Sequence, residues 1–139
     1  GKTVLGDGGG VCQVSTTFFR ALLHAGLPIT ERHAHAYRVG YYEQDGPPGL
    51  DATIYVPSVD LKFKNDTDSY ILVQTQVDPQ LQQLSVFFYG TSDRRSVALT
   101  QPIIFNRIPA RRANMPSPGT DAPPAVFLRP VEFTSIHCA

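Results

Sequence analysis

A cysteine follows three glycines near the start of the sequence, in the stretch Gly8-Gly9-Gly10-Val11-Cys12-Gln13-Val14-Ser15-Thr16-Thr17. The residues from Val11 onward follow an amphipathic helical pattern, which predicts Cys12 in the first turn of a helix. Unpaired backbone N–H groups and the positive end of the helix dipole favour a thiolate there. The pattern is typical of a nucleophilic cysteine beside backbone donors for an oxyanion. The alternative is that Cys12 is a small apolar residue in a tightly packed contact.

A cysteine nucleophile needs a base within hydrogen-bond reach and a group that orients the base. The sequence offers two histidines as the base, of which His35 is the candidate and His33 the alternative, and Asp51 as the orienting carboxylate, all downstream of the predicted helix. In the predicted mechanism, Cys12 attacks an acyl carbonyl while His35 takes its proton, and water or an amine then resolves the thioester. Asp51 has a second interpretation, in which it only fixes the turn after Pro47-Pro48-Gly49.

The residues expected to contact the substrate come from the glycine motif, the first helical turns and the segment with two histidines. They are Gly9, Gly10, Gln13, Ser15, Thr16, His33 and Tyr37. Backbone N–H groups near Cys12, helped by the Gln13 amide, would hold the oxyanion. Ser15 and Thr16 could instead stabilise the helix start, and the histidines could form a solvated face.

No metal-spacing motif is complete, although a metal held by the histidines, Asp51 and Cys12 is an alternative. No metal or cofactor is therefore expected.

One helix is predicted over residues 11–25, because apolar side chains recur there at spacings of three and four. Gly26 and Pro28 end the pattern. This helix places Cys12 at the border of the core, with Thr16 and Phe19 on its own face, where they would line the cleft.

Short β segments separated by polar turns follow the helix. The pattern predicts strands over residues 29–39, 50–56, 59–63, 70–77, 84–89 and 96–99. A strand over 29–39 would place His33, His35 and Tyr37 on one face. The predicted fold class is α+β, with one N-terminal amphipathic helix packed on an antiparallel β-sheet.

The composition indicates one globular domain followed by a tail. The chain has 139 residues, 42% of them hydrophobic, and the proline-rich stretch after about residue 105 predicts a domain over 1–105 and a linker or tail over 106–139.

Twelve basic and twelve acidic residues give a net charge of zero, so a nucleic-acid partner is not indicated. No apolar run approaches the ~18 residues of a membrane helix, so no membrane insertion by this chain is expected. Cys12 and Cys138 are too few for a disulfide framework, and pairing is not favoured.

Four blocks of the sequence together resemble the VanW-like family. They are residues 8–17, Glu31-Arg32-His33-Ala34-His35, Gly49-Leu50-Asp51-Ala52-Thr53 and Asp60-Leu61-Lys62-Phe63-Lys64-Asn65. The resemblance covers roughly residues 1–100 and implies a bacterial, extracytoplasmic protein, in many members anchored to the membrane and joined to cell-wall-associated modules. Members usually carry a segment before the glycine motif, so a truncated domain is expected. Members often have a serine where this chain has Ala36, and any role of that serine is absent here.

Two functions fit these observations. The first is a Cys-dependent acyl-transfer or hydrolase domain, peptidase-like or transpeptidase-like, that acts on peptidoglycan stem peptides in the cell envelope. The second is a non-catalytic module that binds peptidoglycan or serves as a scaffold in glycopeptide resistance. In both, the partner is peptidoglycan or a cell-wall peptide.

Overall fold

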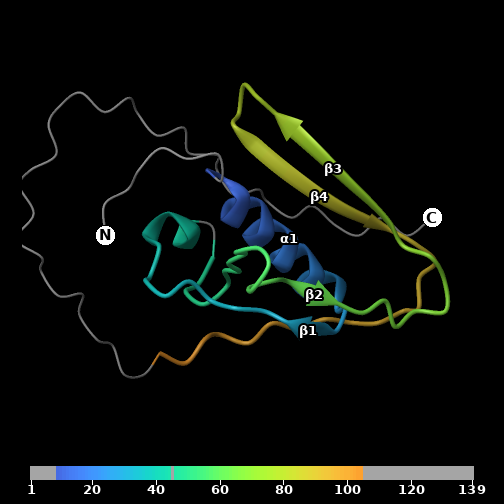
Figure 1. The fold of residues 1–139 in the computed structure, drawn as a ribbon. Helices are drawn as coiled ribbons and strands as arrows, with labels where there is room; N and C mark the ends of the chain where they lie inside the picture. The colour runs from blue at the N-terminus through green and yellow to red at the C-terminus, as the bar shows by residue number, and fades with distance from the viewer. Residues whose placement is uncertain (1–8, 45, 105–139) are drawn as a thin grey trace, which may run out of the picture.

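A computed structural model describes residues 9–44 and 46–104 of the chain. The elements are α1 (Val11–Ala25), β1 (Ile29–Glu31), the 3-10 helix η1 (Gly40–Glu43), β2 (Lys62–Phe63), β3 (Leu72–Asp78) and β4 (Gln83–Tyr89). The strands form two antiparallel pairs, β1–β2 and β3–β4, and α1 lies between these pairs (Figure 1). The predicted α+β class is confirmed, but the sheet is divided into two pairs. The predicted tail and Cys138 lie outside the described residues.

Helix α1 has the bounds that the apolar pattern predicts. It begins after Gly10 and ends at Gly26, and both glycines have positive φ, 92° and 65°. The Gly26 N–H and the Leu27 N–H donate to carbonyls of the last helical turn, which closes the helix C-terminus. A side chain at Gly26 would also meet Val97, because a Cβ built there lies 2.7 Å from Val97 Cγ2.

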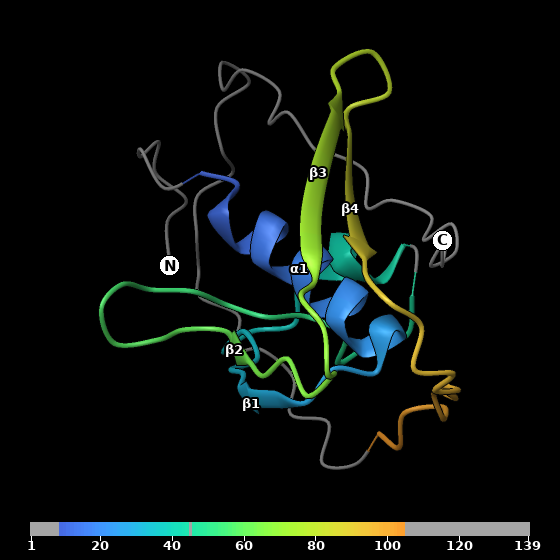
Figure 2. The same cartoon turned by 90° about the vertical axis from the view of Figure 1, so that its right-hand side faces the viewer.

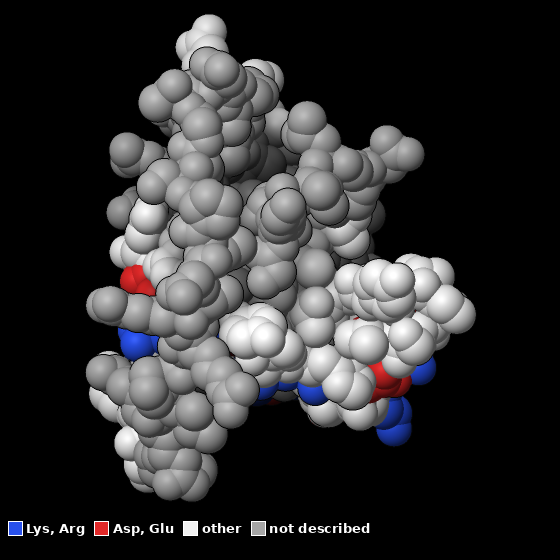
Figure 3. Space-filling model, turned by 60° about the vertical axis from the view of Figure 1, so that its left-hand side comes forward, with Lys and Arg blue, Asp and Glu red and all other residues white. Residues whose placement is uncertain are grey.

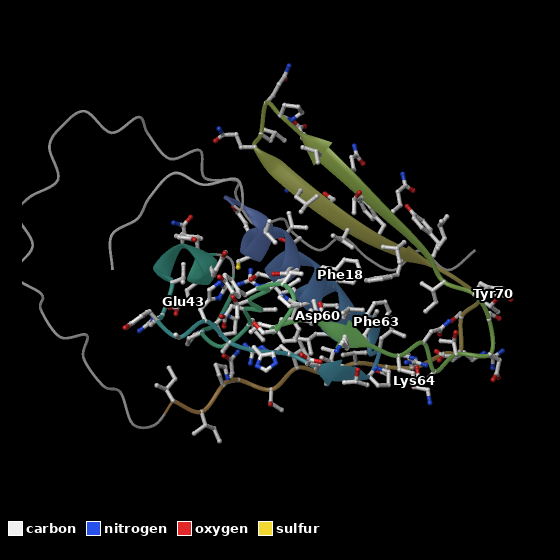
Figure 4. The ribbon with its side chains drawn as sticks, viewed as in Figure 1. Phe18, Glu43, Asp60, Phe63, Lys64 and Tyr70 are labelled. Atoms are coloured by element: carbon white, nitrogen blue, oxygen red, sulfur yellow. The ribbon has the colours of Figure 1, made fainter. Side chains whose placement is uncertain are left out.

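The core lies where α1 meets both strand pairs. Leu22, Ala25 and Leu27 are buried. The Phe18 ring packs 5.8 Å from that of Phe63 in β2 and 5.5 Å from that of Phe88 in β4. Figure 4 shows Phe18 and Phe63 facing each other across the helix–strand contact. One aromatic side chain of α1 therefore contacts both pairs.

The β3–β4 hairpin agrees with the predicted strands over 70–77 and 84–89. Its register runs from Leu72 opposite Tyr89 to Asp78 opposite Gln83, and its turn projects away from α1 (Figure 2). On β4, Leu84 and Val86 are buried, whereas β3 is mostly exposed.

Four predicted strands are shorter or missing in the described part of the chain. The segment 29–39 is a strand only at β1, and the segment 59–63 is a strand only at β2. The segment 50–56 contributes a single bridge between Tyr55 and Val59, and 96–99 forms no strand. In the segments 32–39 and 49–54, side chains bind many of the backbone groups that a ladder would use. These bonds, described below, build the candidate site.

Oppositely charged side chains lie close together on the described surface. In the view of Figure 3, basic and acidic groups lie side by side where the surface is not grey. This agrees with ion pairs such as that of Lys62 with Glu31. Within the described ranges, no helix has the length and hydropathy to cross a bilayer.

Candidate functional site

Cys12 lies in the first turn of α1, half-buried and with a free thiol. Its Sγ is 3.4 Å from Thr53 Oγ1 and 3.7 Å from the carbonyl oxygen of Ile54. The N–H groups of Gln13 and Val14 donate to the Gly10 carbonyl. Among the described residues, the N–H groups of Val11 and Cys12 have no acceptor. The helix start therefore has two backbone donors beside the sulfur that none of the described residues uses.

The segment that carries Asp51 is fixed to α1 one turn after Cys12. Ser15 Oγ lies 2.7 Å from the Ala52 carbonyl oxygen. Thr16 Oγ1 accepts from the Ala52 N–H at 3.1 Å and is 3.2 Å from the same carbonyl oxygen. Ser15, Thr16 and Ala52 are all buried. These bonds explain why a serine and a threonine occupy the buried side of the helix. The contact of Ser15 and Thr16 with a substrate stays a prediction.

His35 and Asp51 form a close pair. Asp51 Oδ2 is 2.6 Å from His35 Nδ1 and also accepts the His35 backbone N–H at 2.8 Å. A carboxylate accepts hydrogen bonds, so it assigns the proton to Nδ1 and leaves the lone pair on Nε2. In the described part of the chain, Nε2 has no hydrogen-bond partner. The pair therefore has the arrangement of an oriented base.

Arg32 holds the other side of Asp51. Its Nη2 lies 3.1 Å from Asp51 Oδ1, its Nε donates to the Asp51 carbonyl, and Nη2 also donates to the Gly49 carbonyl. Burial disfavours the charge on Asp51, but the His35 hydrogen bonds and the Arg32 charge outweigh burial and hold the Asp51 pKa below its usual range. Asp51 therefore fixes the turn and orients His35 at once, which supports both interpretations from the sequence.

Tyr42 is a site residue that the sequence patterns did not single out. It is 4% exposed, and its ring lies 5.2 Å from the His35 ring and 4.5 Å from that of Tyr41. Burial raises the Tyr42 pKa, and Tyr41, Cys12 and Asp51 raise it further. Tyr42 is therefore a neutral phenol within electrostatic range of both Cys12 and Asp51.

Arg20 connects this tyrosine to the helix. It is buried, donates to the Leu50 carbonyl at 2.8 Å and also donates to the Tyr42 carbonyl. A buried arginine costs free energy unless its donors are used. The one sequence signal for this role was a charged residue within the apolar half of α1.

The predicted residues do not all meet. Within the described ranges, no hydrogen bond joins Cys12 Sγ to either histidine. The His33 side chain is 49% exposed beside Glu31, and Tyr37 is 79% exposed. These residues do not share a strand face with His35, because the chain leaves β1 after Glu31. Gly9 and Gly10 lie exposed at the helix start and Gln13 is half-buried, while Thr16 and Phe19, expected to line the cleft, are both buried.

A hollow of about 200 Å³ opens beside the His35–Asp51 pair. Tyr42, Pro47 and Pro48 form part of its wall, together with Arg38 and Glu43, whereas Cys12 does not. In the region that the structure describes, no three His, Cys, Asp or Glu side chains are grouped as metal ligands.

Comparison with known proteins matches the chain to one family and two relatives. The family model described as VanW like protein matches residues 1–88. The chain is 41% identical over 76 residues to the uncharacterized protein YoaR of Bacillus subtilis (strain 168), covering 55% of the chain and 24% of that protein. It is 36% identical over 81 residues to the vancomycin B-type resistance protein VanW of Enterococcus faecalis (strain ATCC 700802 / V583), covering 58% of the chain and 30% of that protein. The chain thus spans less than a third of the length of these curated relatives. No solved structure matches it.

Proposed function

The chain belongs to the VanW-like family, and we propose that it acts in the bacterial cell envelope as a Cys12-dependent acyl-transferase or hydrolase of peptidoglycan stem peptides. The name of one relative refers to vancomycin resistance, and a resistance role in the cell wall suits a protein that acts on wall peptides. The localisation and the substrate are part of this proposal.

One observation carries the chemistry: the thiol of Cys12 and the His35–Asp51 pair are attached to the same end of α1. Cys12 belongs to the first helical turn, and Ala52, next to Asp51, is bound to the second turn by Thr16. A base that is oriented by a carboxylate and fixed to the element of the nucleophile supports a role in nucleophilic catalysis.

In the proposed reaction, Cys12 Sγ forms a bond to the carbonyl carbon of the acyl donor, and its proton passes to His35 Nε2. The N–H groups of Val11 and Cys12 stabilise the oxyanion. His35 then protonates the departing amine and the C–N bond breaks, which leaves a thioester on Cys12. Water or a second amine attacks the thioester, His35 takes the proton of that nucleophile, and the thiol is regenerated.

The observed sulfur position requires one adjustment before this reaction. Cys12 must turn from Thr53 toward His35, or a water molecule must bridge the two residues, and catalytic hydrogen bonds commonly tighten only when substrate is bound.

Digestion of purified peptidoglycan tests the proposal. Wild-type protein and Cys12→Ala are incubated with the same preparation, and soluble and cross-linked products are identified by mass spectrometry. We expect new or lost peptide bonds with wild-type protein only. His35→Gln should lower this activity by about 100-fold or more, the scale of general base catalysis. Product formation by Cys12→Ala equal to wild type would reject the proposal.

A binding module is the second candidate, favoured by the contacts of Cys12 with Thr53 and Ile54 in place of a histidine. In that case the glycine motif and the helix start bind a carboxylate terminus. The two candidates differ in thiol reactivity and in binding. If iodoacetamide modifies Cys12 no faster than a free cysteine near pH 7, and Cys12→Ala binds wall fragments as wild type does, the binding module is correct.

A further inference from the structure

The hollow beside His35 and the thiol of Cys12 lie in different places. His35 and Asp51 contribute to the wall of the hollow, and Cys12 does not. In an acyl-transfer reaction the histidine serves two partners, because it exchanges a proton with the thiol and with the amine that leaves or enters. A cavity that reaches the histidine without the sulfur therefore suits the amine partner better than the acyl donor.

We propose that the hollow bounded by His35, Asp51, Arg38 and Glu43 binds the amine partner of the reaction, and that this amine sits on a carbon that also carries a carboxylate, which Arg38 binds. The proposal rests on the proposed function and specifies one half of its substrate.

The Arg38 guanidinium is held in place by two of its three nitrogen atoms. Its Nε donates to Glu43 Oε1 at 2.5 Å and its Nη2 donates to Glu43 Oε2. Within residues 9–44 and 46–104, Arg38 Nη1 has no hydrogen-bond partner. The Glu43 side chain is 17% exposed and that of Arg38 is 58% exposed. Glu43 thus fixes the plane of the guanidinium, and the remaining N–H groups can bind a carboxylate from solvent.

The charges and the size of the hollow fit an amino-acid end. The Arg38 cation lies beside one carboxylate, Glu43, and the hollow also reaches the anionic Asp51, so negative charge that attracts an ammonium group lies close to a donor for a carboxylate. Its volume of about 200 Å³ is large enough for several water molecules and gives room for the end of one amino-acid residue. Pro47 and Pro48 supply an apolar wall for methylene groups.

The transfer step exchanges one bond at the acyl carbon for another. The neutral amine nitrogen forms a bond to the thioester carbon and the C–S bond breaks. His35 Nε2 takes one proton from the nitrogen and returns it to the sulfur. Arg38 touches only the carboxylate of the amine partner, so it determines specificity and takes no part in the proton transfer.

Binding to a Cys12→Ala protein tests this inference without catalysis. The probes are meso-diaminopimelate and 1,5-diaminopentane, which have the same spacing between amines and differ by the two carboxylates. Titration is followed by amide NMR shifts. We expect meso-diaminopimelate to bind about tenfold or more tightly than 1,5-diaminopentane, because a charge-assisted hydrogen bond is worth at least that ratio.

Variants on the same Cys12→Ala background locate the site. Arg38→Gln should weaken meso-diaminopimelate binding by about tenfold or more and leave 1,5-diaminopentane binding unchanged. Lys64→Gln removes one positive charge at a site far from Glu43 (Figure 4) and should change neither. Since Arg38 is mostly exposed, loss of the fold is not expected, and the amide spectrum checks it.

Equal affinity for the two probes, or equal weakening by Arg38→Gln and Lys64→Gln, would overturn the inference. So would shifts confined to residues outside the wall of the hollow. These outcomes are independent of the peptidoglycan digestion, because a Cys12-independent reaction rejects the proposed function whatever the probes do.

Discussion

The charge on Asp51 depends on its partners more than on its exposure. Burial alone would favour the neutral acid, yet His35 and Arg32 hold the Asp51 pKa below its usual range. A carboxyl group with a lowered pKa in the folded state stabilises the protein above its unfolded pKa, about 3.9. That stabilisation is lost as the pH falls through the lower folded pKa.

Asp51→Asn should therefore destabilise the protein in a pH-dependent way. We expect a loss of about 1–3 kcal/mol in the free energy of unfolding at pH 7, the scale of hydrogen bonds to a charged group. Urea unfolding of both proteins at pH 7 and near pH 2.5 measures the difference, which should shrink at the lower pH. A difference that is the same at both pH values would contradict the role assigned to the Asp51 charge.

The pKa of Tyr42 is shifted in the opposite direction to that of Asp51. Burial raises its pKa, and so do Tyr41, Cys12 and Asp51. Its contribution is therefore complete below the unfolded pKa of about 10 and is lost at higher pH. Wild-type protein should lose free energy of unfolding between pH 9 and 11, and Tyr42→Phe should lose less over the same range. Urea unfolding at these pH values, with Tyr70→Phe as the exposed control, checks this, and identical pH dependences for wild type and Tyr42→Phe would contradict it.

At the scale of elements, the contact between α1 and the segment around Asp51 depends on Thr16. Thr16→Val preserves the shape of the side chain but leaves the buried Ala52 N–H without its acceptor, whereas the Ala52 carbonyl keeps Ser15. We expect a loss of about 1–3 kcal/mol in the free energy of unfolding, the cost of an unsatisfied buried group. The matched control is Thr75→Val on the exposed strand β3, which should change stability by at most about 0.5 kcal/mol.

Thr16→Val should also lower peptidoglycan turnover, because Asp51 and His35 lose their fixed position relative to Cys12. Unfolding curves and product yields are measured on the same preparations. If Thr16→Val and Thr75→Val are equally stable, the contact does not hold the site together.

The elements that were predictable are those whose hydrogen bonds are local or follow a regular ladder. The apolar spacing in α1, and the two β-favouring segments on either side of the turn at residues 78–80, both agree with the structure. The segments 32–39 and 49–54 have β-favouring residues, but Arg32, Thr16 and Asp51 bind their backbone groups with side chains. Periodicity contains no information on such bonds, since they join residues 16 or more positions apart.

The same distinction holds for the candidate site. Cys12, His35 and Asp51 could be proposed together from the sequence because their residue types have few other uses in that combination. The close His35–Asp51 contact agrees with the expected orientation of the base, and the catalytic roles stay predictions. Tyr42 and Arg20 were missed because an aromatic residue in a turn and an arginine in a helix have many uses, and only the fold brings them to the site.

At the scale of the whole molecule, the two strand pairs are joined through α1. A two-stranded sheet is marginally stable alone, so each pair depends on the aromatic cluster of Phe18, Phe63 and Phe88. The pair β1–β2 and the hairpin β3–β4 lie on different sides of α1 (Figures 1 and 2). Phe18 therefore couples the stability of the hairpin to that of the site.

Phe18→Ala should break this coupling. We expect a loss of about 2–4 kcal/mol in the free energy of unfolding, somewhat below the cost of a fully buried phenylalanine, because Phe18 is only half-buried. Amide hydrogen exchange in β3 and β4 should then become faster than in α1, because the hairpin can open while the helix persists.

The matched control is Phe87→Ala, since Phe87 lies on the opposite face of β4 from Phe88 and stacks on Tyr89. It should cost about 1 kcal/mol and leave the exchange order unchanged. Equal losses from the two variants, with β3, β4 and α1 still exchanging together, would show that the hairpin is held by contacts other than Phe18.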